Sequence, residues 1–117
     1  MGKPVRGDVV VIPFPFSDLS GSKRRPALVV AELDGDDLIL CMITGREIGD
    51  KYAVSLDSTD FQSGSLPVSS NIRPSRLFTS DSALVSKTVG QITQAKRLEV
   101  ASKLASLFSL DTAAGND

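Results

Sequence analysis

The sequence predicts a mainly β fold of the α+β class, in which a small, strongly curved sheet or barrel is followed by one C-terminal α-helix. Short apolar runs rich in Val and Ile recur up to residue 92 and are separated by turn-forming Gly, Pro, Ser and Asp. After residue 93 the apolar spacing changes from the period of a strand to that of a helix. The 117 residues fit one domain, which we place over residues 1–110, with a flexible tail over residues 111–117.

Five or six short strands are expected. The first ends at Pro13-Phe14-Pro15-Phe16, whose prolines cannot donate to a ladder, so this part lies at a sheet edge or leaves the sheet. Residues 17–24 are rich in Ser, Gly and charge and predict an exposed loop. Asp34-Gly35 is a tight-turn signal and predicts a hairpin, and Gly90 marks a bulge. The expected strands, in order, are residues 9–12, 27–31, 38–43, 52–56, 66–72 and 85–92.

The C-terminal segment predicts a helix that plugs or flanks the sheet. Thr93 is the expected N-cap, and Glu99 and Lys103 have the spacing of a favourable ion pair. The apolar residues predicted to share one helical face are Leu98, Ala101, Leu104, Ala105 and Phe108.

Several kinds of chemistry are excluded by composition. The chain has no histidine, which rules out the usual zinc motifs, Ser–His and Cys–His nucleophiles, and a two-imidazole ribonuclease. Its one cysteine, Cys41, lies in an apolar run and predicts a buried, inert thiol. We expect no cofactor and no metal, because the aspartates at 34, 36 and 37 belong to a solvated turn. With no signal peptide and no membrane span, a cytoplasmic location is expected.

The net charge of −1 does not by itself indicate nucleic acid, but its distribution is uneven. Residues 1–30 hold five Lys/Arg and two Asp, whereas residues 31–60 hold two Lys/Arg and eight Asp/Glu. A neutral total can therefore hide a basic face opposite an acidic one, although charge scattered over a soluble surface explains the numbers equally well.

Two groups of residues could form one site. Lys23-Arg24-Arg25-Pro26 precedes one strand of the predicted hairpin, and Thr44-Gly45-Arg46 follows the other. With pairing around Asp34-Gly35, opposed positions sum to about 69 or 70, and 25 and 44 sum to 69. The hairpin therefore places the Arg25 guanidinium beside the Thr44 hydroxyl. On composition alone, a solvated basic loop is the better explanation of the Lys23-Arg24-Arg25 run.

Four motifs in order resemble the MazF/PemK family of toxin endoribonucleases. The first runs from Arg6-Gly7-Asp8 through Phe14-Pro15-Phe16-Ser17-Asp18 to Lys23-Arg24-Arg25-Pro26. The others are Ile43-Thr44-Gly45-Arg46, Ile72-Arg73-Pro74-Ser75-Arg76-Leu77-Phe78-Thr79 and Val89-Gly90-Gln91-Ile92. The resemblance implies an SH3-like small barrel, a homodimer, and metal-independent cleavage of single-stranded RNA at short motifs. It also implies a cognate antitoxin, and the disordered tail of that antitoxin occupies the RNA groove. Toxin and antitoxin could bind DNA together.

The resemblance also implies roles for particular residues. The family's catalytic arginine and threonine correspond to Arg25 and Thr44. Arg73 matches a further arginine that some members use with an aspartate two residues later, but the chain has Ser75 there, so a carboxylate base is in doubt. We expect RNA to be bound by Lys23, Arg24, Arg46, Ser75 and Arg76. Phe14 or Phe16 could stack on a base, although core or dimer packing suits each better.

The expected mechanism is attack of the RNA 2′-hydroxyl on the adjacent phosphorus. Arg25 and Arg73 would neutralise the phosphorane, and Thr44 would donate to a non-bridging oxygen or position the 2′-hydroxyl. The general base stays open, because arginine almost never deprotonates. Two alternatives also stay open: a gyrase-poisoning toxin of the same fold, which would depend on the C-terminal helix, and a non-catalytic small-barrel module that binds RNA or peptide.

Overall fold

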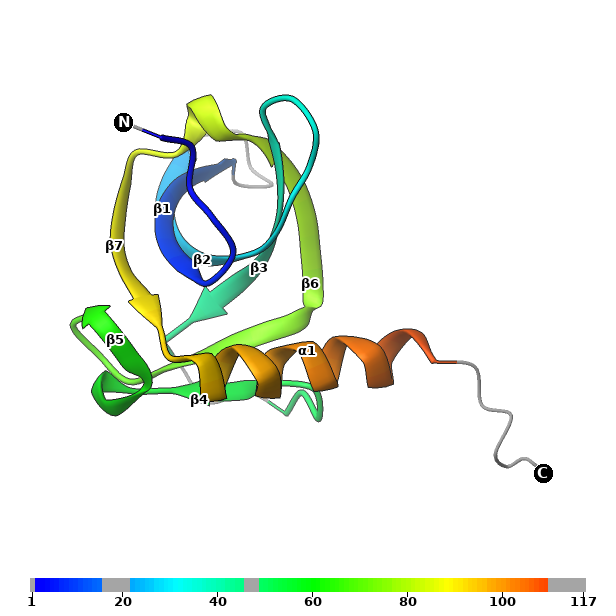
Figure 1. Cartoon of the computed structure of the whole chain (residues 1–117). Coiled ribbons are helices and arrows are strands. Elements are labelled where there is room, and N and C mark those ends of the chain that lie inside the picture. Colours follow the sequence, from blue (N-terminus) through cyan, green and yellow to red (C-terminus); the bar gives the residue numbers. More distant parts are fainter. Residues whose placement is uncertain (1, 16–21, 46–48, 110–117) are drawn as a thin grey trace.

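The computed structural model describes residues 2–15, 22–45 and 49–109 of the chain. Within these ranges, seven antiparallel strands form one curled sheet, a half-barrel, with a single α-helix at its C-terminal end (Figure 1). The strand order is β4-β6-β3-β2-β1-β7-β5. The strands are β1 (Asp8–Pro15), β2 (Ser22–Glu32), β3 (Asp37–Thr44), β4 (Val54–Leu56), β5 (Phe61–Gly64), β6 (Ser70–Asp81) and β7 (Lys87–Ile92). The mainly β architecture with a C-terminal helix is confirmed.

The first strand is longer than its β-branched run. β1 continues through the prolines, where Pro13 pairs with Arg24 of β2, but its pairing with β7 ends at Val11. Among the described residues the proline segment therefore has a strand on one side only, which is the edge position that prolines require. Because β2 begins at Ser22, Lys23 and Arg24 lie on a strand and not in the predicted loop.

The β2–β3 hairpin forms around the predicted turn. Gly35 has a φ of 78°, a left-handed conformation that favours glycine. The pairs Ala27↔Met42 and Leu28↔Cys41 sum to 69, and Glu32↔Leu38 sums to 70 after a bulge. The register predicted from the sequence is therefore confirmed over the paired part of the hairpin.

The sixth strand has a large irregularity. Arg73 lies opposite Met42, but Leu77 lies opposite the next residue of β3, Cys41, so three residues of β6 bulge out of the ladder. The bulge starts at Pro74, which has no backbone N–H to give to a ladder. Of the strand expected over residues 66–72, only residues 70–72 lie in a strand, at the start of β6, and β5 (Phe61–Gly64) was not predicted.

Two apolar clusters fill the two faces of the sheet. One contains Val10, Ile12, Ala27, Val29, Leu38 and Leu40. The other contains Val9, Leu28, Cys41, Ile43, Val54, Leu56, Ile72, Ile92 and Val100. The helix contributes Val100 to the second cluster, and it lies alongside β4 beneath the curled sheet (Figure 1). β7 also has a register shift opposite Val9 and Val10, beside Gly90, where a bulge was predicted.

The helix α1 (Gln94–Phe108) is capped by Thr93, whose side chain accepts from the Lys96 N–H, as predicted. The predicted buried face is wrong in part: Leu98 and Phe108 are 63% and 67% exposed, and the helix instead buries Lys96 and Val100. The described part of the chain contains no helix long and apolar enough to span a bilayer.

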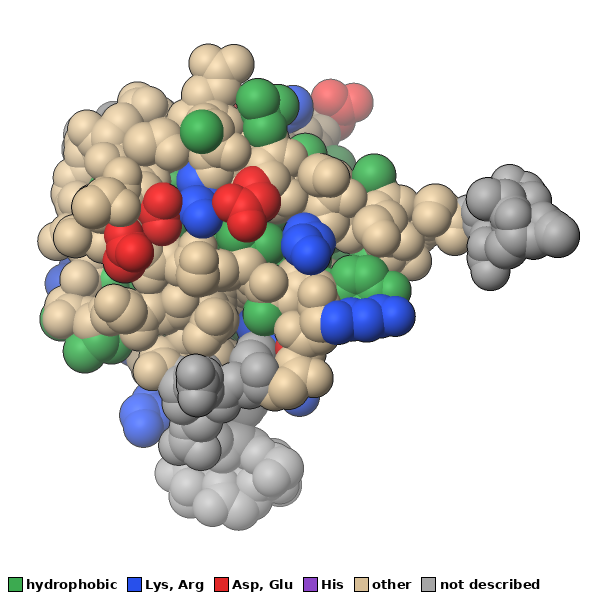
Figure 2. Space-filling model, turned by 90° about the horizontal axis from the view of Figure 1, so that it is seen from below, with side chains coloured by type: hydrophobic (Ala, Val, Ile, Leu, Met, Phe, Trp, Pro, Cys, Tyr) green, Lys and Arg blue, Asp and Glu red, His purple; other side chains and the backbone are tan. Residues whose placement is uncertain are grey.

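A buried lysine explains why the helix turns a different face to the sheet than the apolar pattern predicts. The Lys96 ammonium lies 2.9 Å from Glu99 and 3.6 Å from Asp60, so its stem can pack inward while its charge is paired. Glu99 thus pairs with Lys96 in place of the expected Lys103. Acidic and basic side chains lie next to one another on the face of the molecule seen from below (Figure 2).

Candidate nucleic-acid interface

Three strands bring the main predicted site residues onto one face. Met42 pairs with Ala27 on β2 and with Arg73 on β6, and Thr44 pairs with Asn71. Continuing the β2–β3 register by two residues places Arg25 across from Thr44. Cross-strand partners, and residues two apart on a strand, share a face. Arg25, Thr44 and Arg73 therefore lie on one face, and all three are half-buried.

This face carries the first apolar cluster further along the same strands. Ala27 and Leu40 are buried in that cluster. Ala27 lies two residues from Arg25 and Leu40 four from Thr44, so all four side chains share a face of the sheet. The strands thus change from a packed core to a polar surface at the end of the hairpin away from its turn.

The hydroxyl of Thr44 is shielded from solvent. Its Oγ1 has no hydrogen-bond partner among the described residues. A buried hydroxyl without a partner costs roughly 1–3 kcal/mol, and such groups need an explanation other than folding. A χ1 rotation would move the hydroxyl to another staggered position, so the oxygen can be presented to a ligand on the site face.

A carboxylate that sequence reasoning missed joins the site. Asp50, in the loop between β3 and β4, lies with Oδ2 3.3 Å from Nε of Arg73 and also accepts a hydrogen bond from the Ser75 hydroxyl. Its Oδ1 accepts the Tyr52 N–H at 2.9 Å. The local signal was the turn-like Gly49-Asp50, but no pattern in the sequence connected it with residue 73.

The hydrogen bonds to Asp50 favour its ionised form. The Ser75 hydroxyl, the Tyr52 N–H and the Arg73 guanidinium together hold the pKa of this carboxyl below its ordinary value, against the opposing effect of burial. Asp50 is therefore a carboxylate at neutral pH and a weak proton acceptor. Its arrangement suits holding Arg73 in place better than acting as a general base.

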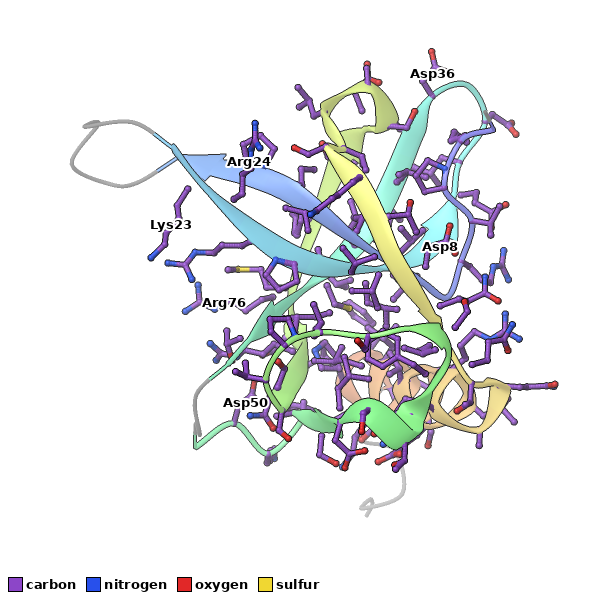
Figure 3. All side chains as sticks on the ribbon, turned by 90° about the vertical axis from the view of Figure 1, so that its left-hand side faces the viewer. Asp8, Lys23, Arg24, Asp36, Asp50 and Arg76 are labelled. Atoms are coloured by element: carbon purple, nitrogen blue, oxygen red, sulfur yellow. The ribbon has the colours of Figure 1, made fainter. Side chains whose placement is uncertain are left out.

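The other predicted RNA-binding residues divide between two faces. Lys23 and Arg76 are exposed and project from the same side of the molecule, beneath the β1–β2 arm and above Asp50 (Figure 3). Arg24 projects from the opposite face of that arm (Figure 3). Ser75 is exposed and bonded to Asp50. Arg46 lies outside the described residues, as do Phe16 and the tail at 111–117, and the Phe14 side chain is not described.

Arg24 and Arg25 both line a cleft of about 340 Å³. The cleft lies between β2 and the segment leading into β6, and Lys87 of β7 adds a second cation to its lining. Ile43 of the second apolar cluster also lines it, and through Arg25 the cleft borders the face that carries Thr44 and Arg73. Lys87 was not among the predicted site residues, because it stands alone in the sequence.

Cys41 takes no part in this site. It is fully buried in the second apolar cluster, and burial raises the pKa of its thiol to about 12. A thiol in this state is a poor nucleophile at neutral pH. The described residues include no group of three or more His, Cys, Asp or Glu side chains that could hold a metal ion.

Comparison with protein families matches almost the whole described chain. Residues 5–108 match the family described as PemK-like, MazF-like toxin of type II toxin-antitoxin system. A search of curated protein sequences finds no match.

Solved structures share the fold at low sequence identity. An endoribonuclease from Mycobacterial species is 17% identical with a TM-score of 0.72, covering 95% of this chain and 96% of that one. An endoribonuclease from Mycobacterial species in complex with its cognate antitoxin is 17% identical with a TM-score of 0.71, covering 88% and 92%. A MazE–MazF structure from Deinococcus radiodurans is 24% identical with a TM-score of 0.73, covering 91% and 96%. At these identities the likeness establishes the fold.

Proposed function

This chain belongs to the family of PemK-like, MazF-like toxins of type II toxin–antitoxin systems, and from that premise we propose that it is a metal-independent endoribonuclease. It cleaves single-stranded RNA at short sequence motifs and so inhibits translation and growth. The observation that carries the proposal is the common face of β2, β3 and β6, on which Arg25, Thr44 and Arg73 lie.

The geometry suits a phosphate held between two arginines. β2 and β6 flank β3, so Arg25 and Arg73 are two strand spacings apart across the sheet, roughly 10 Å, and are offset by two residues along it. Their long side chains can converge over β3. Two guanidinium groups offer the charge and the forked donors that a phosphorane requires. Thr44, on the strand between them, supplies a hydroxyl whose oxygen has no partner in the described chain.

The reaction needs no nucleophile from the protein. The RNA 2′-hydroxyl gives up its proton as its oxygen attacks the adjacent phosphorus, the bond to the 5′ oxygen breaks, and the leaving oxygen takes a proton, so the number of protons does not change overall. The products are a 2′,3′-cyclic phosphate and a free 5′-hydroxyl. Arg25 and Arg73 stabilise the added negative charge, and Thr44 donates to a non-bridging oxygen or aligns the 2′-hydroxyl.

The same surface suits an inhibitory partner. Lys23 and Arg76 extend the positive charge beyond the arginine pair (Figure 3). We propose that a cognate antitoxin places an acidic, disordered segment over this face, folding as it binds. We also propose that the chain forms a homodimer and acts in the cytoplasm.

The substrate itself tests the mechanism. We expect cleavage of a short RNA to continue in chelator and to stop when the nucleotide 5′ to the cut carries a 2′-deoxyribose. The downstream fragment should accept labelled phosphate from polynucleotide kinase without prior phosphatase treatment, because it begins with a 5′-hydroxyl.

The Arg25→Ala variant is the control for contaminating nuclease. It should lose roughly 100-fold or more in rate, the size of effect seen when a preorganised electrostatic group is removed. A 5′-phosphate product, or full activity on the deoxy-substituted substrate, would refute the mechanism. Growth arrest without any RNA cleavage would favour a gyrase-poisoning toxin.

A further inference from the structure

The contact between Asp50 and Arg73 is shielded from water. The Asp50 and Arg73 side chains are 10% and 20% exposed, and Oδ2 lies 3.3 Å from Nε. Ion pairs on the open surface contribute little because water and salt screen them, whereas a shielded pair is screened much less. This contact therefore can hold the guanidinium in one place.

Both oxygens of Asp50 are engaged. Oδ1 accepts the Tyr52 N–H, and Oδ2 accepts the Ser75 hydroxyl as well as Nε of Arg73. A carboxylate held at both oxygens has a fixed plane, and the guanidinium bonded to it takes its direction from that plane.

We infer that Asp50 is a positioning residue, which fixes Arg73 through Nε so that the terminal amino groups of the guanidinium meet the scissile phosphate. This inference rests on the proposed ribonuclease function. It assigns to a loop residue far away in the sequence the carboxylate role that the family resemblance would have placed at position 75.

The contact leaves the important donors available. Nε carries one of the five N–H groups of arginine, and the side chain makes no other hydrogen bond or ion pair to a described residue. Immobilising a long side chain when a ligand binds costs about 0.5–1.5 kcal/mol. Asp50 orders Arg73 before RNA arrives, so this cost is removed from the binding and reaction steps.

The serine at 75 fits the same arrangement. Ser75 lies in the β6 bulge and donates to Asp50. An aspartate at 75 would set a second negative charge against Asp50, and like charges at this distance raise one another's pKa. Serine at 75, in place of the family's aspartate, is therefore what a carboxylate at position 50 requires.

The test is Asp50→Asn, which keeps the shape and removes the charge. We expect kcat for RNA cleavage to fall roughly 10- to 100-fold, as for a misplaced catalytic group, with KM changed less than about threefold. In an Arg73→Ala background the same substitution should have no further effect, because the guanidinium that it positions is gone.

Asp57→Asn is the matched control. Asp57 also accepts the N–H two residues further on, that of Thr59, but is exposed and contacts no arginine among the described residues. It should leave kcat unchanged. Ser75→Ala provides a second variant should Asp50→Asn lower the melting temperature: it removes one hold on Asp50 and should give a smaller loss, again absent in the Arg73→Ala background.

The outcomes distinguish the inference from the proposed function. If the wild-type chain cleaves RNA and the Asp50→Asn variant is equally or more active, the inference alone is overturned. A loss that persists undiminished in the Arg73→Ala background also overturns it, since Asp50 would then act only on the loop. A wild-type chain that cleaves no RNA overturns the proposed function and the inference together.

Discussion

At the scale of single residues, substitution of Thr44 by valine should affect RNA cleavage and stability in opposite directions. Its oxygen is buried without a partner in the described chain, so the folded state bears a cost of roughly 1–3 kcal/mol that valine, which has the same shape, would not bear. We expect Thr44→Val to leave the free energy of unfolding unchanged or to raise it by about 1 kcal/mol in urea titration. The same variant should lose RNA cleavage by roughly 100-fold or more.

Thr44→Ser is the matched control for this prediction. It keeps the hydroxyl and removes the methyl group, so it should stay within about tenfold of wild-type activity while losing roughly 1 kcal/mol of stability. An active Thr44→Val variant would show that the hydroxyl plays no part in the chemistry.

The residues of the site differ in how far sequence could place them. Arg25 and Thr44 flank a hairpin whose turn was recognisable, so simple arithmetic on the register gave their relation. Arg73 was identified by resemblance alone. Asp50 was missed because its partner is 23 positions away, and local patterns say nothing about which loop a curled sheet brings against a given strand.

At the scale of secondary-structure elements, two glycines with the same backbone conformation have different surroundings. Gly64 of β5 has a φ of 70° and Gly35 of the hairpin turn a φ of 78°. A Cβ on Gly64 would collide with the carbonyl oxygen of Val89 and lie 2.5 Å from Cα of Gly90, whereas a Cβ on Gly35 would meet nothing within 4 Å.

We therefore expect Gly35→Ala to lower the free energy of unfolding by about 1–2 kcal/mol, the cost of a left-handed L-residue. Gly64→Ala should lower it by about 3 kcal/mol or more, because the β5–β7 pairing must also open. Urea denaturation of the two variants measures the difference. Equal losses would mean that β5 can move away from β7 at little cost.

Elements were predictable where one physical pattern dominated. The hairpin, the N-cap Thr93 and the bulge beside Gly90 each follow from local chemistry. The long β6 was not predictable, because Pro74 starts a bulge in the middle of it. The helix face was misjudged because Lys96, a charged residue, is buried by ion pairs that only the tertiary structure supplies.

At the scale of the whole molecule, two exposed cations lie beside the site although the total charge is −1. Lys23 and Arg76 project from one side, while Asp36 lies at the tip of the hairpin on the other side (Figure 3). We therefore expect Lys23 and Arg76 to attract an anionic chain to the site, and salt should weaken its binding.

Apolar side chains also remain uncovered on the isolated chain. Leu98 and Phe108 of α1 are 63% and 67% exposed, and Ala101 and Ala105 between them are also exposed. At 100° per residue these four positions form one stripe along the helix. A stripe of this kind on a small protein usually marks a surface that another chain covers.

The stripe gives the expected homodimer a structural reason. The chain has a mass of 12.4 kDa, and light scattering should give about twice that value at concentrations where RNA is cleaved. The measured mass should depend little on salt, because apolar contacts are not screened.

We expect Leu98→Lys to weaken the dimer. Leu84→Lys, at a similarly exposed position in the short 3₁₀ turn Ser82–Leu84, should leave it intact and serves as the control. A fully active protein that scatters as a 12.4 kDa particle would refute the dimer.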